Sequence, residues 1–529
     1  MKRSLTDIKA LLLAKLRHSP RVASLALGLF SGLAMPPIDA WWVFAIGFPL
    51  FFLVVEGATL KRSFLLGWLF GFGYFLAVLH WVGFAFFVDA ASYLWMMPFA
   101  VAALAGGMAQ FWATAILATQ FLVLRGAKVY FAMPFCFGCF EWLRGHVLTG
   151  FPWAVPGLAV DGMGGVAQLA SIVGMNGLTV LVVLWAMIPI AFFRNERGFA
   201  ALALASLIVV WGWGEWRIAA HPTGFVAGVG LRIVQPNISQ SDKWRASNAR
   251  KIFDQLLDLT SAPAASGFTV THVIWPESSM PFLIDESVEG KSEIAGALGD
   301  TKTLLAGAVR RSAPTDDADY FTSVLVFDSK ANVVGQYDKS HLVPGGEFLP
   351  LAWLIEPLGF RKVVNIPESF KAGAGPESVA VPGAGFAGLQ ICYEAIFPDL
   401  AVDVNHRPSW LVNVTNDGWF GNSAGPWQHL AQLRLRAIEQ GLPVARSANT
   451  GISSVIDPVG RYILHSKLGV AGFFDVGLPV ELPTTFYATW GDFALAGLLF
   501  AIVLGQLLIW KKKVNRSLLN GGVKLHQQE

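Results

Sequence analysis

The most informative run in the chain is Gly388-Leu389-Gln390-Ile391-Cys392-Tyr393-Glu394. Its apolar part predicts a strand, and the Tyr-Glu pair that follows predicts a helix start, so the thiol should lie at a strand end. Cys392 is one of three cysteines and the only one between residues 217 and 488. A thiol without a disulfide partner in its own domain is a liability in an oxidising compartment, which suggests that this thiol is used.

The composition divides the chain into an apolar part and a polar part. Hydrophobic residues make up 54% of the chain and charged residues only 14%, whereas soluble domains are about 25% charged. Residues 22–216 are poor in charge, while 217–488 have the composition of a soluble domain. The net charge of +3 is small, and the basic residues of the apolar part flank predicted helices. We therefore expect no nucleic-acid partner.

The apolar part predicts about eight transmembrane helices, of which the first two are short. Lys and Arg residues gather before the first span and after the second, fourth, sixth and eighth, and the positive-inside rule makes that side cytoplasmic. Both termini should then be cytoplasmic. The predicted domains are a membrane domain (1–216), an extracytoplasmic domain (217–488) and a last helix with a cytoplasmic tail (489–529). The predicted spans are 22–36, 40–57, 63–86, 93–124, 128–146, 164–193, 199–216 and 489–510.

Several polar residues fall within these spans, where they are costly and often functional. We expect each of them to lie at an interface or to pair with a neighbouring helix. Cys136 and Cys139 form a C-x-x-C pair inside an apolar segment, and there we predict packing residues, not a redox or metal motif. The polar residues are Glu56, His80, Gln110 and Glu141.

The polar domain alternates predicted strands and helices, which indicates a layered α/β fold. One predicted helix, 426–440, has a clear amphipathic pattern. The predicted strands are 231–234, 272–275, 304–309, 323–327, 333–337, 378–381, 387–392, 410–414, 444–448, 452–456 and 462–464, and the other predicted helices are 246–261, 293–298 and 398–404.

Two further fragments end predicted strands in the same domain: Trp275-Pro276-Glu277-Ser278 and Tyr337-Asp338-Lys339-Ser340-His341. A thiolate is the working nucleophile of a cysteine and needs a base or cation nearby. Glu277 could accept the thiol proton, and Lys339 could stabilise the thiolate and then a tetrahedral intermediate. Alone, each of these residues has a more ordinary interpretation as core, helix cap or solvated charge. Together they predict acyl transfer through a thioester on Cys392.

These three fragments, in this order, resemble the Glu-Lys-Cys triad of the nitrilase superfamily. The resemblance implies an α-β-β-α sandwich, with Glu277 as base, Lys339 as oxyanion stabiliser and Cys392 as nucleophile. The membrane frame around the domain resembles one branch of that superfamily, the apolipoprotein N-acyltransferases. On resemblance alone, supporting or substrate-binding roles fall to Trp244, Glu347, Tyr393 and Glu394.

The resemblance also implies the reaction and its partners. An acyl chain would pass from a membrane phospholipid, with phosphatidylethanolamine the expected donor, through Cys392 to the N-terminal α-amine of diacylglyceryl-modified apolipoproteins. This is the final step of bacterial lipoprotein maturation. The implied location is the bacterial inner membrane with the catalytic domain in the periplasm. We expect no cofactor and no metal, because thioester to amide is downhill and no His/Cys/Asp cluster with ligand spacing is evident.

One departure from the family pattern is visible at Gly345, which stands in Val343-Pro344-Gly345-Gly346-Glu347 where the family usually has Phe. We expect this change to affect acyl-chain contacts and not the triad. Apolar stretches at 349–360, 419–420 and 486–490 are predicted to line the lipid access route or to serve as core and interfacial anchors.

Two other functions fit parts of the sequence. A membrane-tethered amidase or nitrile hydrolase would use the same triad with water as acceptor, although so many spans exceed the needs of a tether. A transporter or lipoprotein-binding scaffold would carry an inactive domain, against which the intact triad argues. A fused glycosyltransferase is excluded, because no room remains for that domain.

Overall fold

The computed structural model describes residues 16–243, 245–315, 318–348 and 370–508. They form two compact units. Of the described residues, the helical unit takes 16–78, 102–214 and 489–508, and the sandwich unit takes those within Leu79–Val101 and Glu215–Ala488. The predicted domain boundaries at 216 and 488 stay a prediction. The sequence analysis placed Leu79–Val101 in the membrane domain, whereas in the structure this segment groups with the sandwich unit.

The helical unit consists of apolar helices. Within the described part of the chain, four helical stretches are long and apolar enough to cross a membrane: Leu60–Phe87, Ala90–Leu124, Val166–Phe193 and Arg197–Ala220. Two shorter apolar helices are Trp41–Val55 (α3) and Phe493–Leu508. The remaining bounds are α2 Pro20–Gly32, α4 Leu60–Leu79, α6 Met97–Leu124, α7 Val129–His146, α8 Ala170–Ala186, α9 Ile188–Phe193 and α10 Arg197–Ala220.

Glu141, one of the span residues predicted to pair with a neighbouring helix, is paired inside this unit. Glu141 and Arg144 of α7 form a fully buried ion pair at 2.7 Å, and Trp112 Nε1 donates to Glu141 Oε1 at 2.7 Å. Asp492 accepts hydrogen bonds from Trp142 Nε1 of α7 at 2.6 Å and from Asn176 Nδ2 of α8. These bonds tie the segment that leads into the last helix to α7 and α8 of the same unit.

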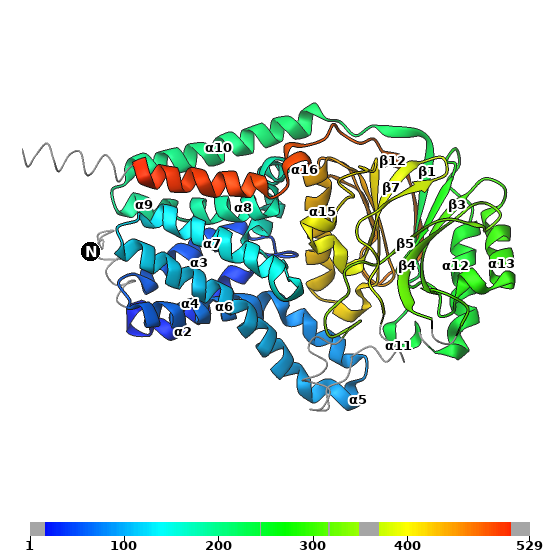
Figure 1. Cartoon of the computed structure of the whole chain (residues 1–529), viewed down its shortest axis with the longest axis horizontal. Coiled ribbons are helices and arrows are strands. Elements are labelled where there is room, and N and C mark those ends of the chain that lie inside the picture. Colours follow the sequence, from blue (N-terminus) through cyan, green and yellow to red (C-terminus); the bar gives the residue numbers. More distant parts are fainter. Residues whose placement is uncertain (1–15, 244, 316–317, 349–369, 509–529) are drawn as a thin grey trace, which may run out of the picture. The chain divides into compact units, whose positions relative to one another are not determined.

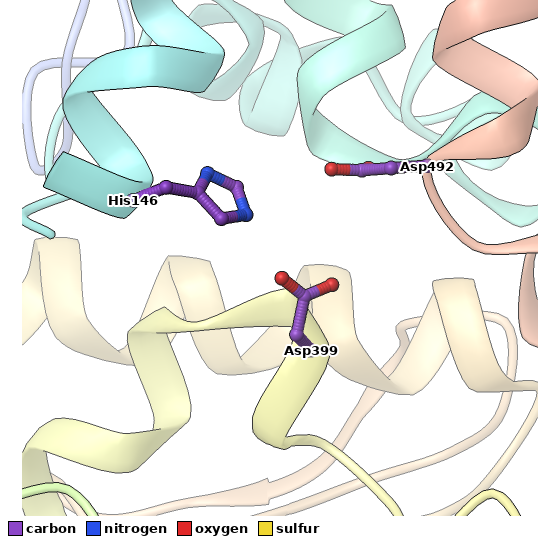
Figure 2. Close-up of side chains that lie close together, drawn as sticks. All are labelled: His146, Asp399 and Asp492. Atoms are coloured by element: carbon purple, nitrogen blue, oxygen red, sulfur yellow. The ribbon is translucent and has the colours of Figure 1, made fainter.

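His146 and Asp492 of this unit are drawn in Figure 2; Asp399, the third side chain there, belongs to the sandwich unit. The three cysteines of the chain are free thiols, including the Cys136–Cys139 pair, in which Cys136 is buried.

The sandwich unit contains two six-stranded sheets packed face to face, with orders β12-β1-β2-β3-β4-β5 and β11-β10-β9-β8-β7-β6. Helices α12 and α13 cover the outer face of the first sheet and α15 covers the second (Figure 1). The strands are β1 Phe225–Gln235, β2 His272–Trp275, β3 Thr303–Arg311, β4 Tyr320–Phe327, β5 Val333–Asp338, β6 Ser378–Val381, β7 Gly385–Ile391, β8 Trp410–Thr415, β9 Val444–Ala448, β10 Ser454–Ile456, β11 Tyr462–His465 and β12 Gly472–Pro479, and the helices are α12 Ala249–Ser261, α13 Val288–Leu298 and α15 Gly425–Gln440.

The alternating apolar residues of the strands build three layers of core. Leu231, Ile274 and Leu389 belong to the cluster between the sheets, whereas Trp275 and Leu304 face α12 and α13. This is the α-β-β-α sandwich that the resemblance to the nitrilase superfamily implied, and it agrees with the layered α/β fold predicted from the strand and helix pattern. Because β1, β2 and β3 run parallel, as do β7, β8 and β9, their carboxyl ends meet at one edge of each sheet.

Two secondary-structure predictions differ from the structure. Strand β12 was missed; it pairs antiparallel with β1, and its Asp475 forms an ion pair with Arg232 at 2.8 Å. Glycines and a charge interrupt its apolar pattern, which conceals it. The helix predicted at 398–404 is wrong: only the 3₁₀ turn Pro398–Leu400 forms, and bends follow it. Asp403 and Asn405 favour turns there, and the Asn405 amide donates to the Asp403 carboxylate.

The segment Leu79–Val101 packs against α15 and the turn at Phe420–Gly421. Trp81 Nε1 donates to Gln428 Oε1 of α15 at 3.1 Å, and its ring lies 4.4 Å from that of Phe420. Gly421 has a φ of +60°, and a Cβ placed there would meet the ring of Phe84. Glycine is therefore required at this contact.

Candidate active site

Cys392 lies immediately after β7 and begins the 3₁₀ turn Cys392–Ile396. Its φ is +50°, a left-handed conformation that is uncommon for a residue other than glycine and costs about 1–3 kcal/mol. Strain of this kind persists only where the surroundings hold it, and it is frequent at active sites. The side chain is 7% exposed, so the thiol is nearly enclosed.

Lys339 and Glu277 come from the ends of β5 and β2, as the sequence predicted. The Lys339 ammonium is 1% exposed and lies 3.5 Å from Glu277 Oε1 and 2.7 Å from Glu347 Oε1. Burial acts to lower the pKa of Lys339, but the carboxylates of Glu347 and Glu277 outweigh it and raise that pKa above its ordinary value. The lysine is therefore a permanent cation at neutral pH.

The Cys392 thiol shares this electrostatic environment. Burial raises its pKa well above the ordinary value, and the Glu277 carboxylate adds to the rise, while Lys339 opposes it. The thiol is therefore protonated at neutral pH. A thiolate can form there only if a neighbouring group takes the proton as the sulfur reacts.

Glu394 joins the loop that follows Lys339, here called the lysine loop, to the turn that begins at Cys392, here called the cysteine turn. Its Oε1 accepts hydrogen bonds from Tyr337 Oη at 2.8 Å and from the Ser340 amide at 2.7 Å. Its Oε2 accepts from the Ile391 amide at 2.7 Å. One buried carboxylate thus fixes the loop that follows Lys339 against the strand end that carries Cys392.

The other residues that the sequence singled out fall in different places. Glu347 closes the lysine loop by accepting from the Val343 amide at 2.8 Å. Tyr393 is buried, with its ring 5.0 Å from that of Phe397. Trp244 and the stretch 349–360 lie outside the described residues. Gly345 has a φ of +79° and open space where a side chain would be, which accounts for glycine at this position.

A second buried cluster beneath Cys392 was not foreseen. His429 of α15 donates through Nε2 to the Cys392 carbonyl oxygen at 3.0 Å, and its Nδ1 lies 2.9 Å from Asp417 Oδ1. Arg446 of β9 forms an ion pair with Asp417 at 2.6 Å. Burial acts to raise the pKa of Asp417, but Arg446 and His429 lower it to about 2. We call Asp417, His429 and Arg446 the anchor cluster.

A second lysine near the triad was also missed. Lys243, at the end of the short helix α11 (Gln240–Lys243), is 2% exposed, and its Nζ donates to the Glu277 backbone carbonyl at 2.9 Å. The residue next to it, Trp244, had been singled out. The sequence does show a lysine in the segment after β1, which could have been considered as a site residue. Nothing in the sequence indicates that this lysine is buried.

Two family profiles match the chain. The profile of the apolipoprotein N-acyltransferase N-terminal domain matches residues 27–188, and the carbon-nitrogen hydrolase profile matches residues 230–469. With the α-β-β-α sandwich and the carboxylate–lysine–thiol cluster, these matches define a membrane-associated member of the nitrilase superfamily.

The relatives narrow the class to one family. The chain is 41% identical to an apolipoprotein N-acyltransferase of Bradyrhizobium diazoefficiens and 38% identical to one of Rhodopseudomonas palustris; each alignment covers 93% of this chain and 95% of the relative. The chain belongs to the apolipoprotein N-acyltransferase family. Among solved structures, Saccharomyces cerevisiae Nit3, a nitrilase-superfamily member, aligns with 16% identity and a TM-score of 0.36 over 47% of this chain and 90% of that one; the family assignment does not depend on it.

Proposed function

We propose that the protein transfers a fatty acyl chain from a membrane phospholipid to the N-terminal α-amine of diacylglyceryl-modified apolipoproteins, the final step of bacterial lipoprotein maturation. The observation that carries this proposal is the convergence of Glu277, Lys339 and Cys392 at the carboxyl ends of β2, β5 and β7, in a chain whose family match spans both units. Phosphatidylethanolamine is the proposed donor.

The first half-reaction forms a thioester. Glu277 takes the proton of the Cys392 thiol as the sulfur attacks the ester carbonyl carbon of the phospholipid. Lys339, held between two carboxylates, stabilises the negative charge on the tetrahedral oxygen. When the carbon–oxygen ester bond breaks, Glu277 returns the proton to the leaving alcohol. A lysophospholipid departs, and the acyl group remains on sulfur.

The second half-reaction forms an amide. The apolipoprotein α-amine attacks the thioester carbonyl carbon, Glu277 accepts a proton from the attacking nitrogen, and Lys339 again stabilises the oxyanion. The carbon–sulfur bond then breaks, and the proton returns to the Cys392 sulfur. The two substrates thus use one site in turn, which is a ping-pong mechanism.

We assign supporting roles to four further residues. Glu347 holds Lys339 in place, and Glu394 holds the lysine loop against the cysteine turn. Tyr393, buried next to the nucleophile, is proposed to contact the acyl chain. Trp244 is proposed to contact substrate on family resemblance alone.

The proposed setting is the bacterial inner membrane. We propose about eight transmembrane helices, cytoplasmic termini and a periplasmic sandwich, because the apolar helices are flanked by basic residues in an alternating pattern. Both substrates are lipid-anchored, so a catalytic domain attached to many spans suits them better than a soluble one.

Acyl trapping tests the proposal and its main rival. Purified protein is mixed with phospholipid that carries a labelled acyl chain, without acceptor, and examined for label that hydroxylamine releases. We expect label on wild type and on the control Cys136→Ala, and none on Cys392→Ala. If wild type binds the lipid but takes no label, acyl transfer is wrong, and hydrolysis of a soluble amide by the same protein would support the amidase alternative.

A further inference from the structure

Lys243 occupies a position that the proposed mechanism does not use. Its side chain is buried, and its ammonium donates to the backbone carbonyl oxygen of Glu277 at 2.9 Å. Burying a lysine is costly unless its charge is compensated. The groups whose charges act on it are Glu277, after β2, and Cys392, after β7. A cation at this point therefore faces both partners of the proposed proton transfer.

The loop that carries Lys243 is held from below by two asparagines. Asn449, after β9, accepts from the Ile238 amide at 2.9 Å and donates to the Ile238 carbonyl at 2.8 Å. Asn416, after β8, donates to Gln240 Oε1 at 2.7 Å. Side chains that follow strands of the second sheet thus fix the loop that follows β1. The position of Lys243 is therefore set by this loop and by its own hydrogen bond to Glu277.

The charge balance of the site explains why a second cation is needed. Glu277 and Glu347 supply two negative charges, while Lys339 supplies one positive charge. With Lys243 protonated the charges of these four groups and Cys392 sum to zero, both before proton transfer and after it, when Cys392 carries the negative charge and Glu277 the proton. Two further charged groups lie nearby: the Glu394 carboxylate, which is held by the Ser340 and Ile391 amides, and Asp417, which is paired with Arg446. Without Lys243 every one of these states has an uncompensated negative charge in a buried site, which disfavours a thiolate or an oxyanion.

We propose that Lys243 is a positioning and charge-balancing residue of the active site, which fixes the main chain that carries Glu277 and compensates the negative charge that forms on Cys392. The inference rests on the proposed function for its catalytic meaning, but its effect on the thiol does not require turnover. Glu277 and Lys339 remain the groups that exchange the proton and stabilise the oxyanion.

The pH dependence of the site gives this role a specific signature. Burial lowers the pKa of Lys243 to about 8, with Glu277 and Cys392 opposing the shift. Lys243 is therefore charged below about pH 8 and loses its charge above it. In wild type, thioester formation should fall as the pH rises through this range. Lys243→Arg keeps a cation at high pH and should shift that decline to higher pH.

The test uses the full-length protein in detergent with Cys136 and Cys139 replaced by alanine. Two quantities are followed from acid to alkaline pH: thioester formation from labelled phospholipid, and alkylation of Cys392 by iodoacetamide. For Lys243→Met we expect a loss of at least about tenfold in thioester formation, equivalent to one unit of pKa, and alkylation that requires higher pH. Lys302→Met is the matched control, because Lys302 also donates to a backbone carbonyl, that of Leu298 at 3.1 Å, on a different element.

The outcomes separate the possibilities. If Lys243→Met behaves like wild type in both measurements, the inference is wrong. If Lys243→Arg is as impaired as Lys243→Met at every pH and both melt at lower temperature, the lysine is only structural and the inference is again wrong. If wild type forms no thioester but Lys243→Met still shifts the alkylation profile, the acyl-transfer proposal fails while the charge-balancing role stands. Should Lys243→Met not fold, Lys243→Gln replaces it.

Discussion

Two buried polar clusters flank Cys392, and they are built differently. In the first cluster, the Lys339 ammonium lies 2.7 Å from Glu347 but 3.5 Å from Glu277, so the geometry is partly loose. In the anchor cluster, Asp417 forms close contacts at 2.6 and 2.9 Å, and every side chain is fully buried. The looser contact in the first cluster leaves Glu277 free to gain and lose a proton, whereas the close contacts of the anchor cluster hold its three side chains in one arrangement. We infer that one cluster performs the chemistry and the other holds the strained nucleophile turn.

The largest expected effect comes from the reacting cluster. Glu277→Gln keeps the size and hydrogen-bonding capacity of the side chain but removes the proposed base, so thioester formation should fall by about 10²–10⁴-fold. The melting temperature should stay close to that of wild type. Single-turnover labelling of Cys392 measures the rate, with Glu293→Gln as a control on an exposed ion pair. A near-normal rate would remove Glu277 from the reaction.

The anchor cluster should respond in stability first. Asp417→Asn leaves Arg446 buried without its carboxylate, which should lower the free energy of unfolding by about 3–5 kcal/mol. Thermal melting in detergent measures this loss. The control is Asp254→Asn, which breaks an exposed ion pair with Arg250 and should cost less than about 1 kcal/mol. Equal effects of the two substitutions would show that the anchor cluster has no special structural role.

The pH dependence sharpens the same contrast. Because the pKa of Asp417 is lowered from 3.8 to about 2, the stability that it contributes is present above its ordinary pKa and is lost as the pH falls through about 2. The difference in stability between wild type and Asp417→Asn should therefore shrink between pH 4 and pH 2 by about 2 kcal/mol. A difference that stays constant down to pH 2 would contradict this role of the carboxylate.

The smallest effect is expected in the lysine loop, at Gly345. Alanine at a φ of +79° should destabilise the protein by about 1 kcal/mol, although the space for a side chain is open. Gly346→Ala is the matched control, since its backbone conformation suits any residue. Unfolding measurements on both variants should differ in that direction. If Gly345→Ala is neutral, the family aromatic is absent here for a reason other than backbone conformation.

The sequence singled out residues of the proposed reacting cluster but none of the anchor cluster, and the reason is physical. Glu277, Lys339 and Cys392 each end an apolar strand, so the local pattern places them at sheet edges. Asp417, His429 and Arg446 come from a loop, a helix and a strand that meet only in the folded sandwich. The helix predicted at 426–440 was interpreted as amphipathic, a pattern that normally places the polar face in solvent. Its polar residues His429 and Arg436 are in fact fully buried. The polar face of this helix therefore belongs to a buried network.

Most strands of the sandwich followed from the same local patterns, with exceptions where tertiary contacts decide. Strand β12 depends on its pairing with β1 and on the Arg232–Asp475 ion pair, neither of which is local. The grouping of Leu79–Val101 with the sandwich depends on contacts such as Trp81 with Gln428. Lys243 could be seen in the sequence, but its burial could not, because lysine is almost always exposed.

The membership of Leu79–Val101 in the sandwich unit has a consequence for protein engineering. A fragment cut at residue 215 to obtain a soluble catalytic domain would omit the partner of Gln428 and uncover Phe420 and Gly421, next to Asp417 of the anchor cluster. Expression of 215–488 alone is therefore expected to yield an aggregation-prone product. A usable soluble form would need Leu79–Val101 supplied in trans or grafted through a linker, so that the catalytic module consists of two pieces of chain.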